Sequence, residues 1–143
     1  MKTVPAPLSR ANLRRLINAC DTETLAGTRD RYILALGWAL AVPRSWLAVV
    51  QIEDAHDGWF KGYAGGLGEW HRDWLTALAL AAGKPVLSGP LLWSITRYDQ
   101  LSHPGMSGDA INDVVQRAVH RAKLGEPWRY SAHSLRLGGR AGV

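Results

Sequence analysis

The feature that most constrains this fold is a helical apolar period between positions 107 and 122. Apolar side chains recur there every three or four residues, at Ile111, Val114, Val115, Ala118, Val119 and Ala122. This spacing is typical of an amphipathic helix with one face packed into a core. We expect the helix to begin at Ser107, a good N-cap residue, and to stop before Gly125 and Pro127. The chain is therefore built at least partly from packed helices.

Other stretches carry weaker helical patterns. We expect a helix after the N-cap Ser9 and a largely apolar one at 29–41, capped by Thr28 and ended by Pro43. Further helices are expected at 45–49, at 69–82 and from Ser131 onward. Trp38, Trp70, Trp74 and Trp93 are interpreted as packing aromatics, although a tryptophan can also stack on a base.

The β structure is expected to be small. Aromatic residues alternate loosely with glycines over 54–68, which favours a short strand or a ragged hairpin. The segment 89–105 is expected to be irregular, because Pro90 and Pro104 limit any helix there. With 143 residues, the chain is long enough for one domain. The expected fold is a single α+β domain over 1–143, mostly α with a small β hairpin or short sheet.

Positive charge gathers in the last thirty residues. The net charge is +5, and residues 1–113 hold equal numbers of basic and acidic side chains. The excess consists of Arg117, Arg121, Lys123, Arg129, Arg136 and Arg140, opposed by Glu126 alone. Such a stretch favours a polyanion such as DNA, but it also fits a charged face kept for solubility. Both interpretations stay open from charge alone.

Several protein classes are excluded or disfavoured. No apolar run is long enough for a membrane span, and the first residues do not resemble a secretion signal. A single cysteine, Cys20, rules out an internal disulfide, so we expect a cytoplasmic protein. The five histidines show no metal-ligand spacing, and no phosphate-binding loop or nucleophile elbow occurs. We therefore expect neither a metal site nor a cofactor.

One pair of residues could carry chemistry. His133 and Arg136 lie three positions apart, so they share one face of the expected last helix. A guanidinium can grip a phosphate by two parallel hydrogen bonds, and an imidazole can exchange a proton near neutral pH. A chain with this many histidines and arginines contains roughly 0.4 such pairs by chance. The pair alone therefore fits either a phosphodiester site or coincidence.

Longer matches favour the phosphodiester site. Residues 25–54, beginning Leu-Ala-Gly-Thr-Arg-Asp-Arg-Tyr and ending Glu-Asp, resemble the opening of the tyrosine recombinase (phage integrase) catalytic domain. Three later segments resemble its second half in the same order: 89–93, 106–107 with the following helix, and 131–136. The resemblance implies that DNA is cut and rejoined through a covalent phosphotyrosine. It also implies that His133 and Arg136 hold the scissile phosphate and that Lys61, in a shortened hairpin, assists the leaving oxygen.

The resemblance also exposes two departures. Pro43 stands where the family has its first catalytic arginine, and Arg44, the next residue, is the possible substitute. Seven residues follow Arg136, and no tyrosine lies among them, although the family's nucleophile follows this motif. We expect the family's N-terminal DNA-clamping domain to be absent as well. We therefore expect a truncated, degenerate recombinase domain that does not cut DNA by itself.

Two alternatives remain at this stage. The first is a non-catalytic DNA-binding module that uses Arg117, Arg121, Lys123, Arg129 and Arg140, and that interferes with an intact recombinase. The second is a decayed fragment without independent function, in which an uncovered apolar face promotes self-association. Both differ from the enzyme in what they do with DNA: the module binds it without cutting, and the fragment does neither.

Overall fold

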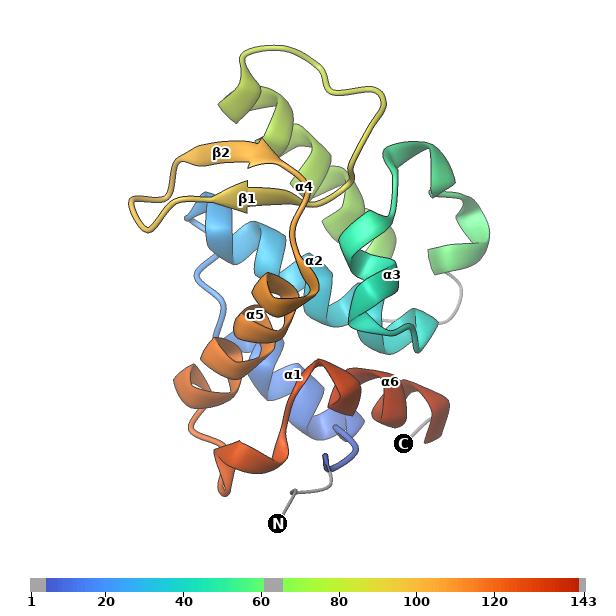
Figure 1. Ribbon diagram of the computed structural model, residues 1–143, viewed down its shortest axis with the longest axis vertical. Coiled ribbons are helices and arrows are strands. Elements are labelled where there is room, and N and C mark those ends of the chain that lie inside the picture. Colours follow the sequence, from blue (N-terminus) through green and yellow to red (C-terminus); the bar gives the residue numbers. More distant parts are fainter. Residues whose placement is uncertain (1–4, 61–65, 142–143) are drawn as a thin grey trace.

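The computed structural model describes residues 5–60 and 66–141, and it confirms the expected fold class. Most of the chain is helical, and a two-stranded antiparallel sheet lies at one edge (Figure 1). The helices are α1 (Arg10–Asn18), α2 (Leu25–Leu40), α3 (Arg44–Val49), α4 (Leu67–Ala82), α5 (Gly108–Arg121) and α6 (Ala132–Ala141). The strands are β1 (Trp93–Ile95) and β2 (Leu101–Pro104), and short 3₁₀ turns occupy Ile52–Asp54 (η1), Asp57–Phe60 (η2) and Pro127–Arg129 (η3).

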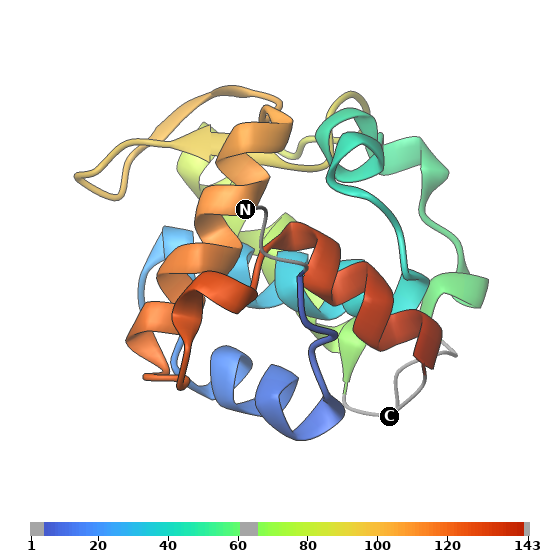
Figure 2. The ribbon, with the colours of Figure 1, turned by 60° about the horizontal axis from the view of Figure 1, so that its bottom comes forward.

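Helix α2 forms the centre of the core. It contacts α1, α3, α4, α5 and α6, and nearly all of its residues from Gly27 to Trp38 are buried (Figures 1 and 2). A helix that is apolar on all sides must be covered on all sides, as its sequence indicates. Of the four tryptophans expected to pack, Trp38 and Trp74 are buried and Trp70 and Trp93 are half-buried against the core. Among the described helices, none is long and apolar enough to cross a membrane.

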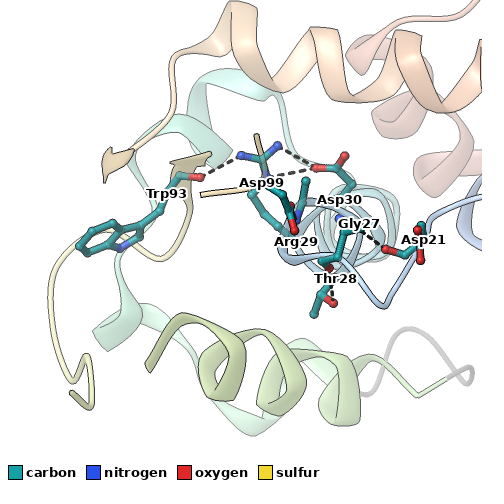
Figure 3. A network of polar contacts seen from close by, with 9 residues as sticks. Asp21, Gly27, Thr28, Arg29, Asp30, Trp93 and Asp99 are labelled. Atoms are coloured by element: carbon teal, nitrogen blue, oxygen red, sulfur yellow. Dashed lines mark hydrogen bonds and ion pairs between the residues drawn. The ribbon is translucent and has the colours of Figure 1, made fainter. Parts of the chain in front are cut away.

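The start of α2 differs from the sequence-based prediction. Thr24, not Thr28, is the N-cap, and its hydroxyl oxygen accepts a hydrogen bond from the Gly27 amide at 2.9 Å. The amides of Leu25 and Ala26 donate to the carboxylate of Asp99, at 2.9 and 2.8 Å. Figure 3 shows this carboxylate beside the first turn of the helix. The helix begins earlier than predicted because a distant residue supplies acceptors for its first amides.

A buried ion pair lies just inside this helix. The Nε and Nη2 atoms of Arg29 donate to one carboxylate oxygen of Asp30, at 3.0 and 2.9 Å, and Nη1 donates to the Trp93 carbonyl (Figure 3). The two side chains are 4% and 6% exposed. Burial raises the pKa of the Asp30 carboxyl, and the neighbouring Arg29 opposes that rise. The pair joins α2 to strand β1.

The position of the sheet corrects the predicted β element. Strands β1 and β2 form a hairpin within 93–104, the segment predicted to be irregular. Within the predicted hairpin, 54–68, residues 54 and 57–60 lie in 3₁₀ turns, residues 67 and 68 begin α4, and residues 61–65 lie outside the described residues. The aromatic residues of the turns serve packing: Trp59 is buried and meets Trp46 edge-on at 5.5 Å between ring centroids. Pro104 is tolerated because a two-stranded sheet consists of edge strands only.

Helices α5 and α6 complete the core on the side opposite α4. Helix α5 begins after Ser107, whose hydroxyl accepts from the Ala110 amide at 3.0 Å, as the sequence predicted. Helix α6 packs very closely against α2. A side-chain carbon on Gly138 would lie 1.9 Å from the Leu8 carbonyl oxygen, and one on Gly139 would lie 1.9 Å from that of Trp38. Only glycine fits at these two positions.

Candidate functional site

A cavity of about 490 Å³ lies where α3, α5 and α6 meet. Three separate segments of the chain form its wall: Pro43, Arg44 and Ser45; Asn112; and Ser131, Ala132 and His133. The wall combines a guanidinium, an imidazole, an amide and two hydroxyls, so it can offer several hydrogen bonds to an anion. The fold thus brings together Arg44 and His133, two residues singled out from the sequence that lie far apart in the chain.

Arg44 is held loosely at the start of α3. Helix α2 ends where Ala41 adopts a left-handed conformation, with φ at 52°, and Pro43 then forms the N-cap of α3. Arg44 is the first helical residue, and its Nη1 atom lies 3.3 Å from Oδ1 of Asp109. The two side chains are 48% and 89% exposed. An ion pair this exposed contributes little stability, so the guanidinium is available to another anion.

His133 and Arg136 lie on the first turns of α6. His133 is exposed and forms part of the cavity wall. Arg136 is half-buried one turn further along, and its Nε atom is buried without a hydrogen-bond partner among the described residues. Most buried polar atoms in proteins have partners, and among the described residues the Arg31 Nε atom is the other exception of this kind. The two residues three positions apart share a face of the helix, as predicted.

Asn112 is a wall residue that sequence reasoning missed. Its Oδ1 atom accepts a hydrogen bond from the backbone amide of Ala132, at 2.9 Å, and so links α5 to the start of α6. In the sequence, an asparagine beside the apolar positions of an amphipathic helix is indistinguishable from a solvated polar residue. The contact spans twenty residues, and no local pattern could have indicated it.

The other predicted site residues are placed elsewhere or not described. Lys61 lies outside the described residues. Arg117 contributes to a separate small cavity with Arg29, and Arg121 lies close to Cys20 of the α1 side. Arg117 and Arg121 are thus on the other flank of α5 from Asn112. Three remaining cations are exposed at chain turns or ends, namely Lys123 after α5, Arg129 in η3, where it pairs with Glu126 at 2.9 Å, and Arg140 in the last turn of α6.

Glu53, Asp54 and Cys20 make contacts within the fold and lie outside the candidate cavity. Glu53 accepts a hydrogen bond from the Gly89 amide at 2.8 Å, and Asp54 accepts one from the Gln51 amide at 2.9 Å, so this acidic pair stabilises turns. Cys20 is buried, and desolvation raises the pKa of its thiol to about 11. Within 5–60 and 66–141, no group of three or more His, Cys, Asp or Glu side chains gathers as a metal site would require.

Comparisons with known proteins agree with the resemblance in the sequence. No family model matches the chain. An integrase/recombinase XerD homolog from Selenomonas ruminantium is 30% identical over 155 aligned positions, which cover 93% of this chain and 44% of that protein. The chain therefore spans less than half the length of this relative. The similarity extends over almost the whole chain, and it supports a relationship between this protein and the tyrosine recombinases.

Proposed function

We propose that this protein is a recombinase-related domain that binds the sugar–phosphate backbone of DNA in the cavity between α3, α5 and α6. The observation that carries the proposal is the convergence of Arg44 and His133 on one cavity, with Arg136 on the same helix as His133. The similarity to an integrase/recombinase homolog supports DNA as the partner.

The chemistry of the wall suits a phosphodiester. The Arg44 guanidinium can donate two parallel hydrogen bonds to the phosphate oxygens, and the His133 imidazole can donate another when it is protonated. Arg136 adds a positive charge from the same helix, with a buried Nε that has no partner among the described residues. Together these groups would stabilise the charge on a phosphate, whether it is simply bound or is reacting.

We further propose that the domain binds this phosphate without cutting DNA. In the resemblance, Pro43 replaces the first clamping arginine, and a proline side chain has neither charge nor donor. Losing one such donor typically costs about 2.7–4 kcal/mol of transition-state stabilisation, which is about 10²–10³ in rate. Of the three tyrosines that the structure describes, Tyr32, Tyr98 and Tyr130, none forms part of the cavity wall.

The binding proposal is tested by titrating a fluorescent duplex with the protein at several salt concentrations. Binding should weaken as salt rises, with a slope of about −0.9 per phosphate contact, because bound phosphates release their counterions. Alanine variants of Arg44 and His133 should bind more weakly than the wild-type protein. Absence of binding at about 50 mM salt would overturn the proposal and leave the fragment without DNA function.

A second assay separates binding from cutting. A nicked suicide substrate traps a covalent protein–DNA adduct when a tyrosine attacks, and the adduct is visible on a denaturing gel. We expect no adduct, and its appearance would overturn the claim that the domain does not cut. If DNA binding depends on Arg117 and Arg121 but not on Arg44 and His133, the chain is instead a binding module that uses its basic C-terminal stretch.

A further inference from the structure

The first two turns of α5 touch both walls of the cavity. Gly108 packs against the Arg44 side chain, since a side-chain carbon built on this glycine would lie 3.5 Å from its Cγ, Cδ and Nε atoms. Asp109 forms the ion pair with Arg44. One turn later, Asn112 binds the start of α6. Residues three and four apart share a helix face, so Gly108, Asp109 and Asn112 form one contact surface facing α3 and α6.

Asn112 contacts the backbone amide of Ala132, the residue directly before His133. The first amides of a helix have no carbonyl partner within the helix and need acceptors from elsewhere. An N-cap side chain serves the second or third amide, so the first amide of α6, that of Ala132, needs another acceptor, and it donates to Asn112 on another helix. Ala132 is 3% exposed, so water gives this amide little alternative. The Ser131 and Ser134 amides bond within the turn, to the Ser134 hydroxyl at 3.1 Å and to the Ser131 carbonyl at 2.9 Å.

We propose that Asn112 is a positioning residue that fixes the first turn of α6 so that His133 faces the phosphate cavity. The proposal deepens the proposed function and rests on it for the identity of the ligand. The hydrogen bond anchors the backbone one residue before His133, and this anchor sets the direction of the His133 side chain. Without it, the first turn loses an acceptor and frays, and the imidazole no longer keeps one orientation toward the cavity.

The hydrogen bond itself is tested without DNA. In the wild-type protein, a scalar coupling across the hydrogen bond between the Ala132 nitrogen and the Asn112 side-chain carbonyl carbon should be detectable by NMR. Asn112→Ala should accelerate hydrogen exchange of the Ala132 amide by at least about tenfold, because a helix-capping acceptor is lost. Asn112→Asp keeps an acceptor oxygen at the same place and should retain the protection. Gln116→Ala, an exposed change on the same helix, is the matched control and should leave the exchange unchanged.

A double-mutant cycle tests whether Asn112 acts through His133. Asn112→Ala and His133→Ala should each weaken binding of a short DNA duplex by roughly tenfold, a typical loss when one hydrogen bond to a charged group disappears. The double variant should bind no more weakly than His133→Ala alone, because removing His133 also removes what Asn112 positions. A role in general stability would instead give losses that add.

The possible results separate the two proposals. If the wild-type protein binds no DNA, the proposed function fails, while the coupling and the exchange data still decide whether Asn112 anchors α6. If the coupling is absent and Ala132 exchanges equally in all variants, the positioning role is wrong whatever the DNA result. Additive losses of affinity in the cycle would also overturn it. If Asn112→Ala does not fold, the wild-type coupling and the Asn112→Asp protein carry the test.

Discussion

Arg29 and Arg44 carry the same guanidinium group, yet the protein surrounds them in opposite ways. All three side-chain nitrogens of Arg29 donate to protein acceptors, and the group is almost fully buried (Figure 3). Arg44 lies beside a cavity, half exposed, with one long contact to an exposed carboxylate. A buried cation whose three nitrogens all have protein acceptors holds the fold together, and an exposed cation with donors to spare can bind a ligand. The contrast separates an arginine that stabilises the fold, Arg29, from Arg44, which we propose binds phosphate.

The largest effect should follow from breaking the buried pair. Arg29→Ala leaves the Asp30 carboxylate buried without its partner, so the free energy of unfolding should fall by about 3–5 kcal/mol. Urea denaturation followed by circular dichroism measures this loss. Arg72→Ala, which removes an exposed arginine from α4, is the control and should change stability by less than about 0.5 kcal/mol. A small loss in Arg29→Ala would erase the contrast between the two arginines.

At the cavity we expect a substitution to change DNA binding strongly and stability only little. Arg44→Ala should leave the thermal midpoint nearly unchanged but cost about 1.5–3 kcal/mol of DNA binding, because a charge-assisted hydrogen bond to phosphate is lost. The dependence of affinity on salt should become shallower by about one phosphate contact. Fluorescence anisotropy at several salt concentrations measures both quantities, again with Arg72→Ala as the control. Equal affinity of Arg44→Ala and wild type would contradict the functional assignment of Arg44.

A third change sharpens the comparison on the structural side. Asp99 has a left-handed backbone, with φ at 61°, and its carboxylate caps α2. Asp99→Gly relieves the backbone but removes the cap, so we expect a loss of about 0.5–2 kcal/mol in the free energy of unfolding. Asp99→Asn tolerates the same backbone and keeps one acceptor, so it should lose less. If Asp99→Gly is as stable as the wild-type protein, the cap contributes nothing measurable to the free energy of unfolding.

A smaller effect of opposite sign is expected at the cavity. Asp109→Asn removes a negative charge beside Arg44, so DNA affinity should rise by about two- to fivefold at low salt. The gain should shrink as salt screens the charge. The same change at Asp113, which is also exposed on α5 but forms no ion pair with Arg44, is the matched control. An equal gain in Asp113→Asn would mean that net charge alone, and not the freedom of Arg44, sets the affinity.

The smallest effect concerns a half-buried polar pair, Tyr32 and His71, in which burial disfavours the charged form of the histidine. The Tyr32 hydroxyl lies 2.5 Å from Nδ1 of His71, and burial, with Arg72 nearby, lowers the pKa of His71. The unfolded chain then takes up the proton more readily, so stability should fall as the pH drops below about 6.5. Denaturation at pH 7.5 and 5.5 should show a weaker pH dependence in His71→Gln. Identical pH profiles for variant and wild type would contradict this role of His71.

Local patterns in the sequence were sufficient for most helices. Helix α5 and its N-cap were predicted because both depend on neighbouring residues, namely the apolar period and Ser107. One error came from a distant contact: the start of α2 was misplaced because Asp99 supplies acceptors for its first amides. The hairpin at 93–104 was missed because its prolines favoured an irregular segment, although local bonds to Thr96 close its turn. The glycines and aromatics of 54–68 favoured a hairpin, whereas residues 52–60 fold as turns packed around Trp59.

The candidate site was predictable to a similar degree. His133, Arg136 and Arg44 were singled out from one short motif and the family resemblance, and two of them form part of the same cavity wall. Their catalytic roles, and the DNA-binding roles of the C-terminal cations, stay predictions. Charge counting placed Arg117 and Arg121 in one basic stretch with His133, but a helix sends neighbouring residues to different flanks. Asn112 escaped notice because the amide that donates to it belongs to another helix.

Gly138 and Gly139 of α6 limit which mutations the cavity can tolerate during evolution. Gly138 and Gly139 let the end of α6 contact the Leu8 and Trp38 carbonyls. At the start of the helix, Asn112 accepts a hydrogen bond from the Ala132 amide. Contacts at both ends of α6 restrict its rotation and its translation. Even one added methyl group at Gly138 should therefore tilt α6 and move His133, at the other end of this helix, relative to the cavity. Mutations behind the cavity, which would not contact DNA, should therefore weaken the proposed phosphate binding as mutations inside it would.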